Sequence, residues 1–347
     1  MATPDIEYEF DDKPSPGDTQ EIASGIQWLR MPLPFALDHI NLWLFEDNDA
    51  WVIVDSGLGA DNSKEAWENA FVNAMGGRPA SQIVVTHLHP DHAGCAGWLA
   101  DRFDVDLWMT REEYMLCRIL VADTDRPAPH EGVEFYKAAG FGDDALNNYR
   151  KMFGLFGRYV TPLPESYRRL YDGQKGPVGD HDWEVVVGRG HSPEHACFFN
   201  EELNLFVSGD QVLPTISANV SVYPTEPDAN PLKDWIDSLR SIRNRIPEDV
   251  LVLPAHGKPF RGAHARIDQL VGDHLSQLDA LLAYCTESRR VVDVFPALYR
   301  TKITKDNLMF ATGEAVAHLN YLINEGAITV EQDIDGVAWY RRKDFEG

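Results

Sequence analysis

The sequence predicts a protein of the α/β class, and three observations support this class. Between residues 26 and 103, runs of β-branched and aromatic residues alternate with segments of helical periodicity, which is the order of elements in α/β folds. Short apolar runs typical of strands return between residues 183 and 257. Histidine, aspartate or glycine follows several of these runs, where α/β sheets gather their functional groups.

The first elements follow from residue types. Residues 26–59 have the apolar runs and turn residues of antiparallel strands. Residues 63–77 have apolar residues at helical spacing and end in two glycines, which predicts a helix. A buried strand is expected over residues 81–89. Because Pro90 suits the first turn of a helix, a second helix is expected over residues 90–103.

The length of 347 residues favours more than one domain. We expect an acidic N-terminal tail over residues 1–20, an α/β domain over 21–263 and a smaller C-terminal domain over 264–347. The α/β domain contains a helical insertion over residues 110–170 that is rich in aromatic residues. These aromatic side chains either fill a core of their own or line a pocket beneath a lid.

The C-terminal domain is predicted to contain three helices followed by a two-stranded hairpin. The hairpin turn is expected at Asp335 and Gly336. This is the order of elements in a small winged-helix unit.

Composition disfavours several classes of protein. The chain has 55 acidic and 31 basic residues and a net charge of −24, so its average surface repels polyanions and nucleic acid is disfavoured as a partner. No apolar run approaches the roughly 18 residues of a membrane span. The N-terminus lacks the features of a signal peptide, so a cytoplasmic location is expected. The four cysteines form no CxxC pair, which fits reduced, packed thiols.

A cluster of histidines follows the strand predicted over residues 81–89. Side chains two apart in a strand face the same side, so His87 and His89 can reach one point in space. Pro90 then starts a helix, whose first turn places Asp91 and His92 nearby. These four residues nearly supply the ligands of one metal site and make a second metal conceivable.

Three later loops offer further ligands. His191, Asp210 and His256 each lie in a loop that follows a predicted strand. Together with the histidine cluster they give seven nitrogen and oxygen ligands, enough for two divalent metal ions. Zinc is expected first, with iron or manganese as alternatives.

This ordered set of motifs resembles the metallo-β-lactamase superfamily. The resemblance is carried by THLHPDHAG, GHSPEH, SGDQ and AHG, with VDSG upstream, and it spans about residues 20 to 262. It implies an αββα sandwich with a dinuclear metal site at one edge. The ligands that it implies are His87, His89 and His191 for one metal, Asp91, His92 and His256 for the other, and Asp210 as the bridge between them.

Two further residues are candidates for positions around the ligands. The resemblance implies that Asp55 orients a ligand, as groups around metal sites generally do, and a turn-capping role is the alternative. His195, four residues after His191, either lines the site or packs in the core. We expect His39 to be structural, although strand ends near the N-terminus border the cleft in this family.

The implied chemistry is hydrolysis. Two cations about 3.5 to 4 Å apart can share a water and lower its pKa to about 7, so that a bridging hydroxide attacks an electrophilic centre. Asp91 is the candidate catalytic residue that carries a proton to the leaving group.

The expected substrate is a small acyl compound, either an ester or a thioester, including acyl thioesters and lactones. A bridging aspartate together with HxHxDH resembles the thioesterase, lactonase and nuclease branches more than the β-lactamases. An apolar pocket formed by the aromatic insertion would suit an acyl chain.

The C-terminal domain makes the whole chain similar to the LACTB2-like group of hydrolases, which includes a ribonuclease. A metal-dependent nuclease and a DNA-binding ligand sensor are therefore the alternatives. Residues 264–347 contain nine Lys and Arg against thirteen Asp and Glu. This composition disfavours binding to the phosphates of a nucleic acid. We expect this domain instead to cap the active site or to pair two subunits in a homodimer.

Overall fold

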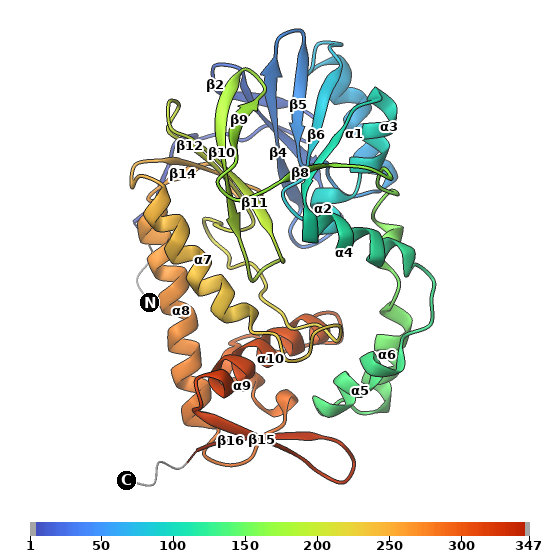
Figure 1. Cartoon of the computed structure of the whole chain (residues 1–347), viewed down its shortest axis with the longest axis vertical. Helices are drawn as coiled ribbons and strands as arrows, with labels where there is room; N and C mark the ends of the chain where they lie inside the picture. Colours follow the sequence, from blue (N-terminus) through green and yellow to red (C-terminus); the bar gives the residue numbers. More distant parts are fainter. Residues whose placement is uncertain (1–4, 344–347) are drawn as a thin grey trace. The chain divides into compact units, whose positions relative to one another are not determined.

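The computed structural model describes residues 5–343, which divide into two compact units. The first, the sandwich unit, comprises the residues up to 124 together with 155–218 and 239–267. The second unit comprises 125–154, 219–238 and the residues from 268 onward. Figure 1 shows the elements of each unit. This division differs from the predicted segments 21–263 and 264–347, because part of the helical insertion packs with C-terminal elements.

The first sheet of the sandwich unit has seven strands in the order β2-β3-β4-β5-β6-β7-β8. Their bounds are β2 Thr19–Ala23, β3 Ile26–Pro32, β4 His39–Asp47, β5 Ala50–Val54, β6 Ala80–Val84, β7 Leu107–Thr110 and β8 Arg168–Leu170. Strands β2 to β5 form an antiparallel meander, and β3 to β5 lie in the region predicted as antiparallel strands. From β5 to β8 the neighbours are parallel, which is the part of the chain where strands and helices alternate.

The second sheet has the order β1-β14-β13-β12-β11-β10-β9. Its strands are β1 Glu7–Tyr8, β9 Lys175–Val178, β10 His181–Gly188, β11 His195–Asn200, β12 Leu205–Gly209, β13 Leu251–Pro254 and β14 Phe260–Arg261. Strand β1 pairs with β14 and lies within the segment predicted as a tail, of which residues 1–4 lie outside the described residues. The first two residues of β2 lie within that segment as well.

Four helices and a short 3-10 turn belong wholly to the sandwich unit. They are α1 Asp61–Val72, α2 Pro90–Ala93, α3 Ala96–Phe103, α4 Arg111–Ala122 and η1 Phe156–Arg158. Trp67 of α1 and Leu99 of α3 are fully buried in one cluster with Leu29 of β3, which places these helices on the first sheet. Arg245 at the end of α7 (Pro231–Arg245) bonds to Glu184 of β10 in the second sheet at 2.6 Å.

The two sheets enclose an aromatic core between them. Phe45 of β4 stacks on Trp183 of β10 with a centroid separation of 4.7 Å, and Trp28, Phe198 and Leu253 are completely buried in the same cluster. Each such side chain contributes about 1.5 to 3 kcal/mol through burial. With helices outside both sheets, the predicted αββα sandwich is confirmed.

One predicted strand ends earlier than expected, and one predicted helix is interrupted. Strand β6 stops at Val84, so that His87 and His89 lie in the bend that follows it and not within the strand. The helix predicted over 90–103 is two helices, α2 and α3, which are separated at Gly94 and Cys95. At Gly94 a Cβ would lie 2.2 Å from the backbone nitrogen of Gly59, so close backbone packing fixes this break.

The second unit contains two helices of the insertion and most of the C-terminal region. Its elements are α5 His130–Ala138, α6 Asp143–Met152, η2 Val291–Asp293, α9 Phe295–Leu298, α10 Leu308–Asn324, β15 Ile328–Gln332 and β16 Ala338–Arg342, while α7 and α8 (Ala263–Tyr284) contribute to both units. The backbone nitrogen of Val292 donates to the carbonyl of Ala139. The predicted hairpin is present, with Gly336 at a φ of 81° in its turn. Of the described helices, none has the length and apolar character needed to cross a membrane.

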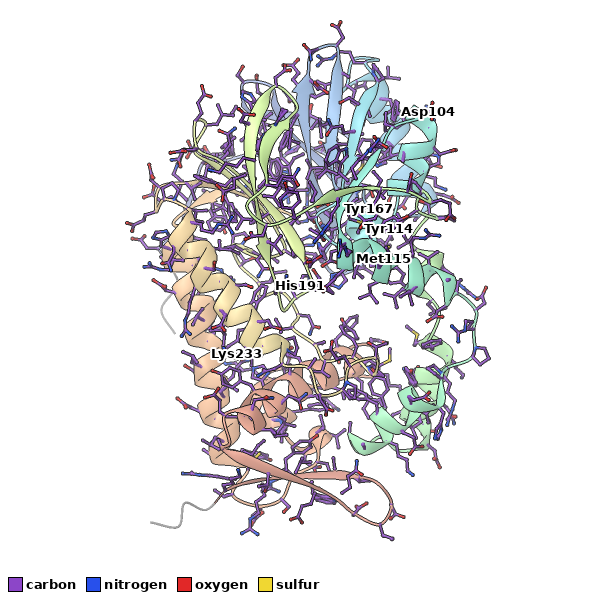
Figure 2. The ribbon with its side chains drawn as sticks, in the orientation of Figure 1. Asp104, Tyr114, Met115, Tyr167, His191 and Lys233 are labelled. Atoms are coloured by element: carbon purple, nitrogen blue, oxygen red, sulfur yellow. The ribbon has the colours of Figure 1, made fainter. Side chains whose placement is uncertain are left out.

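The aromatic residues of the insertion divide between the cores of the two units. In the sandwich unit, Tyr114 of α4 stacks on Tyr167 at 3.9 Å (Figure 2). In the second unit, Tyr136 packs against Phe141 and Tyr149 with centroid separations of 5.0 and 4.6 Å. Of the two roles considered for these aromatic residues, packing into a core is the one that these contacts support.

Candidate metal centre

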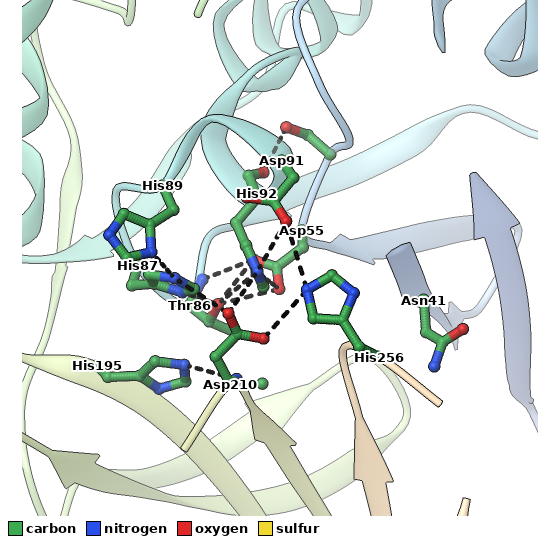
Figure 3. Close-up of polar contacts among 12 residues, drawn as sticks. Asn41, Asp55, Thr86, His87, His89, Asp91, His92, His195, Asp210 and His256 are labelled. Carbon is green, nitrogen blue, oxygen red and sulfur yellow. Dashed lines mark hydrogen bonds and ion pairs between the residues drawn. The ribbon is translucent and has the colours of Figure 1, made fainter. Parts of the chain in front are cut away.

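The seven predicted ligands meet at one edge of the sandwich unit, beyond the ends of several strands. Figure 3 labels six of them, all except His191. The bend after β6 carries two of them and the short helix α2 carries two more, while the loops after β10, β12 and β13 carry one each. They form two groups in each of which the potential ligand atoms lie within 4.8 Å of one another. The first ligand group is His87, His89, His191 and Asp210, and the second ligand group is Asp91, His92 and His256.

The first ligand group is compact and largely buried. Nε2 of His87 lies 2.9 Å from Nδ1 of His89 and 3.2 Å from Nε2 of His191. The Oδ2 atom of Asp210 lies 3.4 Å from Nε2 of His191. Three imidazoles and a carboxylate that converge at these separations supply the number and type of ligands that a zinc ion takes.

The second ligand group lies on the other side of Asp210. Nε2 of His256 is 3.4 Å from Oδ2 of Asp91 and also 3.4 Å from Oδ1 of Asp210. Nε2 of His92 lies 3.6 Å from Oδ2 of Asp210. Since its Oδ1 faces His256 and its Oδ2 faces His191, the Asp210 carboxylate lies between the two groups.

Hydrogen bonds fix the orientation of the histidine rings. Nδ1 of His256 donates to the carbonyl of His39 at 2.9 Å, and Nδ1 of His92 donates to Oδ2 of Asp55 at 2.8 Å. Nδ1 of His87 lies 3.1 Å from Oγ1 of Thr86, whose own proton goes to Asp55. Because Nδ1 of each of these rings is engaged away from the centre, Nε2 is the nitrogen that each ring turns toward it, as in metal-binding histidines.

Asp55 connects the His92 ring to the backbone that precedes His87. Besides its bond to His92, it accepts from the backbone nitrogen of Thr86 at 2.8 Å. It is almost fully buried and has a φ of 64°, a left-handed conformation that is uncommon outside glycine. Through these bonds Asp55 contacts both the ring of His92 and the backbone immediately before His87.

The electrostatics of the centre suit bound cations. Burial lowers the pKa of His89 to about 3 and that of His87 well below its usual range, so both rings are neutral, which is the form that binds metals. Burial disfavours charge on Asp210, but His256 and His92 outweigh it and hold its pKa well below its usual value. Within the described part of the chain, the buried Nε2 of His92 and Oδ1 of Asp210 have no hydrogen-bond partner. The residues therefore fit a centre that binds divalent cations.

His195, the remaining predicted site residue, is fully buried beside the ligands. Its Nε2 accepts a hydrogen bond from the backbone nitrogen of Asp210 at 3.1 Å, and its ring stacks on His87. Because that nitrogen is already engaged, His195 supports the ligands and does not extend the ligand set.

The loop that carries His256 is held by residues at the start of β4. The amide of Asn41 donates to the carbonyls of Pro254 and Gly257, both at 2.8 Å. The Nε2 atom of His39 accepts from the backbone nitrogen of Gly257 at 3.0 Å. Sequence reasoning missed Asn41, although a buried amide within an apolar run is a recognisable signal, and it treated His39 as structural.

Glu113 is a second residue that sequence reasoning missed. It lies in the first turn of α4 and is fully buried, and burial raises the pKa of its carboxyl group. It accepts from the backbone nitrogens of Leu88 and Glu194. Acidic residues are common at helix starts, so the sequence carries no signal that separates Glu113 from its exposed neighbour Glu112.

Comparisons with known proteins agree with this geometry. The profile of the Metallo-beta-lactamase superfamily matches residues 36–258, and the profile of the Metallo-beta-lactamase-like, C-terminal domain matches residues 278–343. The crystal structure of a beta-lactamase domain protein from Burkholderia ambifaria is 40% identical, with a TM-score of 0.89 over 97% of this chain and 98% of that chain.

Two curated relatives cover most of the chain. The probable metallo-hydrolase YqjP of Bacillus subtilis is 25% identical over 87% of this chain and 93% of its own length. The acyl-coenzyme A thioesterase MBLAC2 of Gallus gallus is 22% identical over 74% of this chain and 85% of its own length.

Proposed function

The chain belongs to the metallo-beta-lactamase superfamily, and we propose that it is a dinuclear metal-dependent hydrolase of acyl thioesters or related esters and lactones. The observation that carries the proposal is the position of Asp210, whose carboxylate lies 3.4 Å from His191 of the first ligand group and 3.4 Å from His256 of the second. A carboxylate in this position can bridge two cations. Zinc is the metal that the ligand set favours first, with iron and manganese as alternatives.

The roles of the chain's own residues follow from the geometry. The first and second ligand groups would each hold one ion, with Asp210 shared. Divalent cations held there would supply Lewis acidity, which polarises a carbonyl group and lowers the pKa of water to about 7. Asp91 is proposed to carry the proton to the leaving group, because its side chain is 22% exposed whereas that of Asp210 is 10% exposed.

An acyl substrate is supported by the thioesterase among the relatives. The net charge of −24 disfavours a nucleic-acid substrate. A nuclease of the LACTB2-like type and a DNA-binding sensor with a winged-helix terminal domain remain the alternatives. Both require a phosphate-binding surface, and residues 264–347 contain more acidic than basic residues.

A substrate screen tests the proposal. The metal-loaded chain is assayed with acyl-CoA and glutathione thioesters, lactones, RNA and DNA. We expect hydrolysis of at least one thioester or lactone. His89→Ala should lower the rate by more than the roughly 10- to 100-fold that is lost when an outer partner of a metal ligand is removed. His181→Ala, at the opposite end of β10 from the His191 loop, is the control.

Two results would count against the proposal. Turnover of RNA or DNA alone would support the nuclease alternative. DNA binding in a gel-shift assay, without hydrolysis of any substrate, would support the sensor alternative.

A further inference from the structure

On the basis of the metal centre proposed above, we infer that Glu113 is a positioning residue that ties together the two loops carrying the histidines of the first ligand group. Glu113 is fully buried, and each of its carboxylate oxygens takes one backbone N–H. Oε2 accepts from Leu88 at 2.9 Å, and Oε1 accepts from Glu194 at 2.7 Å.

The two amides come from two different ligand-bearing loops. Leu88 lies between His87 and His89, so fixing its backbone fixes the bend that presents both rings. Glu194 lies in the loop after β10, three residues after His191. A single side chain therefore links the two loops whose histidine Nε2 atoms lie 3.2 Å apart.

The backbone around Glu113 supports this function. Strand β7 is parallel to β6, and the nitrogen of Val85 donates to the carbonyl of Trp108, which brings the start of α4 beside the bend after β6. Oγ1 of Thr110 donates to the carbonyl of Glu194 at 2.7 Å. The backbone nitrogen of Glu112 donates to the Glu194 side chain at 3.0 Å. The junction of β7 and α4 thus holds the His191 loop at several atoms.

The chemistry of the bonds makes the carboxylate hard to replace. A buried carboxylate is tolerated only when its oxygens are hydrogen-bonded, and these oxygens accept from two N–H donors. Glutamine has the same shape, but it presents one oxygen and one NH2 group. The NH2 group would face the N–H of either Leu88 or Glu194, so the hydrogen bond to one of the two loops would be lost.

The test compares metal binding by the wild-type chain and by three variants. Glu113→Gln removes one acceptor, and Glu113→Asp keeps both oxygens on a shorter side chain. Glu112→Gln is the matched control, because Glu112 occupies the same helical turn but is exposed. Zinc is titrated into metal-free protein in competition with a chromogenic chelator, and the absorption spectrum of the cobalt(II) form reports ligand geometry. Urea unfolding of the metal-free proteins measures any purely structural effect separately.

We expect the wild type to bind two ions. Glu113→Gln should lower the zinc affinity of one of the two sites by about 10- to 100-fold. The affinity of the other site should stay within about twofold of the wild-type value, and the cobalt spectrum should change. Glu113→Asp should weaken binding at the affected site to a smaller extent, and Glu112→Gln should match the wild type. Unchanged zinc affinity and an unchanged cobalt spectrum in either Glu113 variant would overturn the inference and leave the proposed function intact. A wild type that binds no metal would overturn both.

Discussion

The Nδ1 atom of His92 lies 2.8 Å from Oδ2 of Asp55, and both side chains are buried. This bond orients the His92 ring so that its Nε2 faces the Asp210 carboxylate. Asp55 also accepts from the backbone nitrogen of Thr86, the residue immediately before His87. One carboxylate thus orients His92 of the second ligand group and the start of the segment that carries His87 and His89 of the first ligand group.

Replacing Asp55 by asparagine tests this relationship. The amide cannot accept from both Thr86 and His92, so the His92 ring should lose its fixed orientation. We expect a loss of about 10- to 100-fold in zinc affinity, measured by chelator competition. Asp61→Asn, at the exposed start of α1, is the control. An Asp55→Asn protein with wild-type affinity would show that His92 does not need this partner.

Gly209 immediately precedes Asp210 and is required by close packing. Its φ is 51°, and a Cβ at this position would lie 2.4 Å from Cε1 of His195. Gly209→Ala should therefore destabilise the fold by about 1 to 3 kcal/mol and displace the Asp210 carboxylate, which lowers metal affinity.

Urea unfolding of the metal-free proteins measures the loss of stability at Gly209. The control is Gly272→Ala in helix α8, where a Cβ meets nothing within 4 Å and a small gain in stability is expected. Equal stabilities of Gly209→Ala and the wild type would contradict the packing argument.

Glu314 of α10 makes stability depend on pH in the second unit. Burial raises the pKa of its carboxyl group from 4.5 to about 7, and the hydroxyl of Tyr299 lies 3.3 Å away. Between these two pH values the folded chain keeps a proton that the unfolded chain releases. The contribution of Glu314 to the free energy of unfolding is therefore greatest below about pH 4.5 and is lost as the pH rises to about 7.

Glu314→Gln should remove this dependence. From pH 4.5 to pH 8, the wild type should lose on the order of 1 to 3 kcal/mol of unfolding free energy relative to the variant. The nearby His274 and His318, whose pKa values burial lowers to about 3 and about 4, titrate in both proteins, so their effects cancel in the difference. A difference that stays constant with pH would contradict the raised pKa.

Much of the candidate site could be predicted from the sequence, because its ligands lie in short motifs whose residue types bind metals. His87, His89, Asp91 and His92 fall within six positions, and each later ligand follows an apolar strand. The αββα fold was predictable for the same reason, since the motifs resemble those of a known superfamily.

The surrounding contacts could not be predicted, because they join residues far apart in the sequence. Asn41 bonds to the carbonyl of Gly257, 216 positions away, and nothing in a local pattern reports that pairing. The division of the 110–170 insertion between the two units also depends on contacts between distant residues, since the carbonyl of Ala139 accepts from Val292 of the C-terminal region. The break at Gly94 likewise reflects close approach to Gly59, which lies in a different loop.

The central claim is that the two ligand groups and Asp210 together bind two metal ions, and the metal content of the purified chain tests it most directly. After metal-free protein is exposed to zinc and freed of unbound ions, we expect two ions per chain. Asp210→Ala should hold at most one. A wild-type chain that retains no zinc, iron or manganese when each is offered would contradict the account, as would an Asp210→Ala chain that still holds two ions.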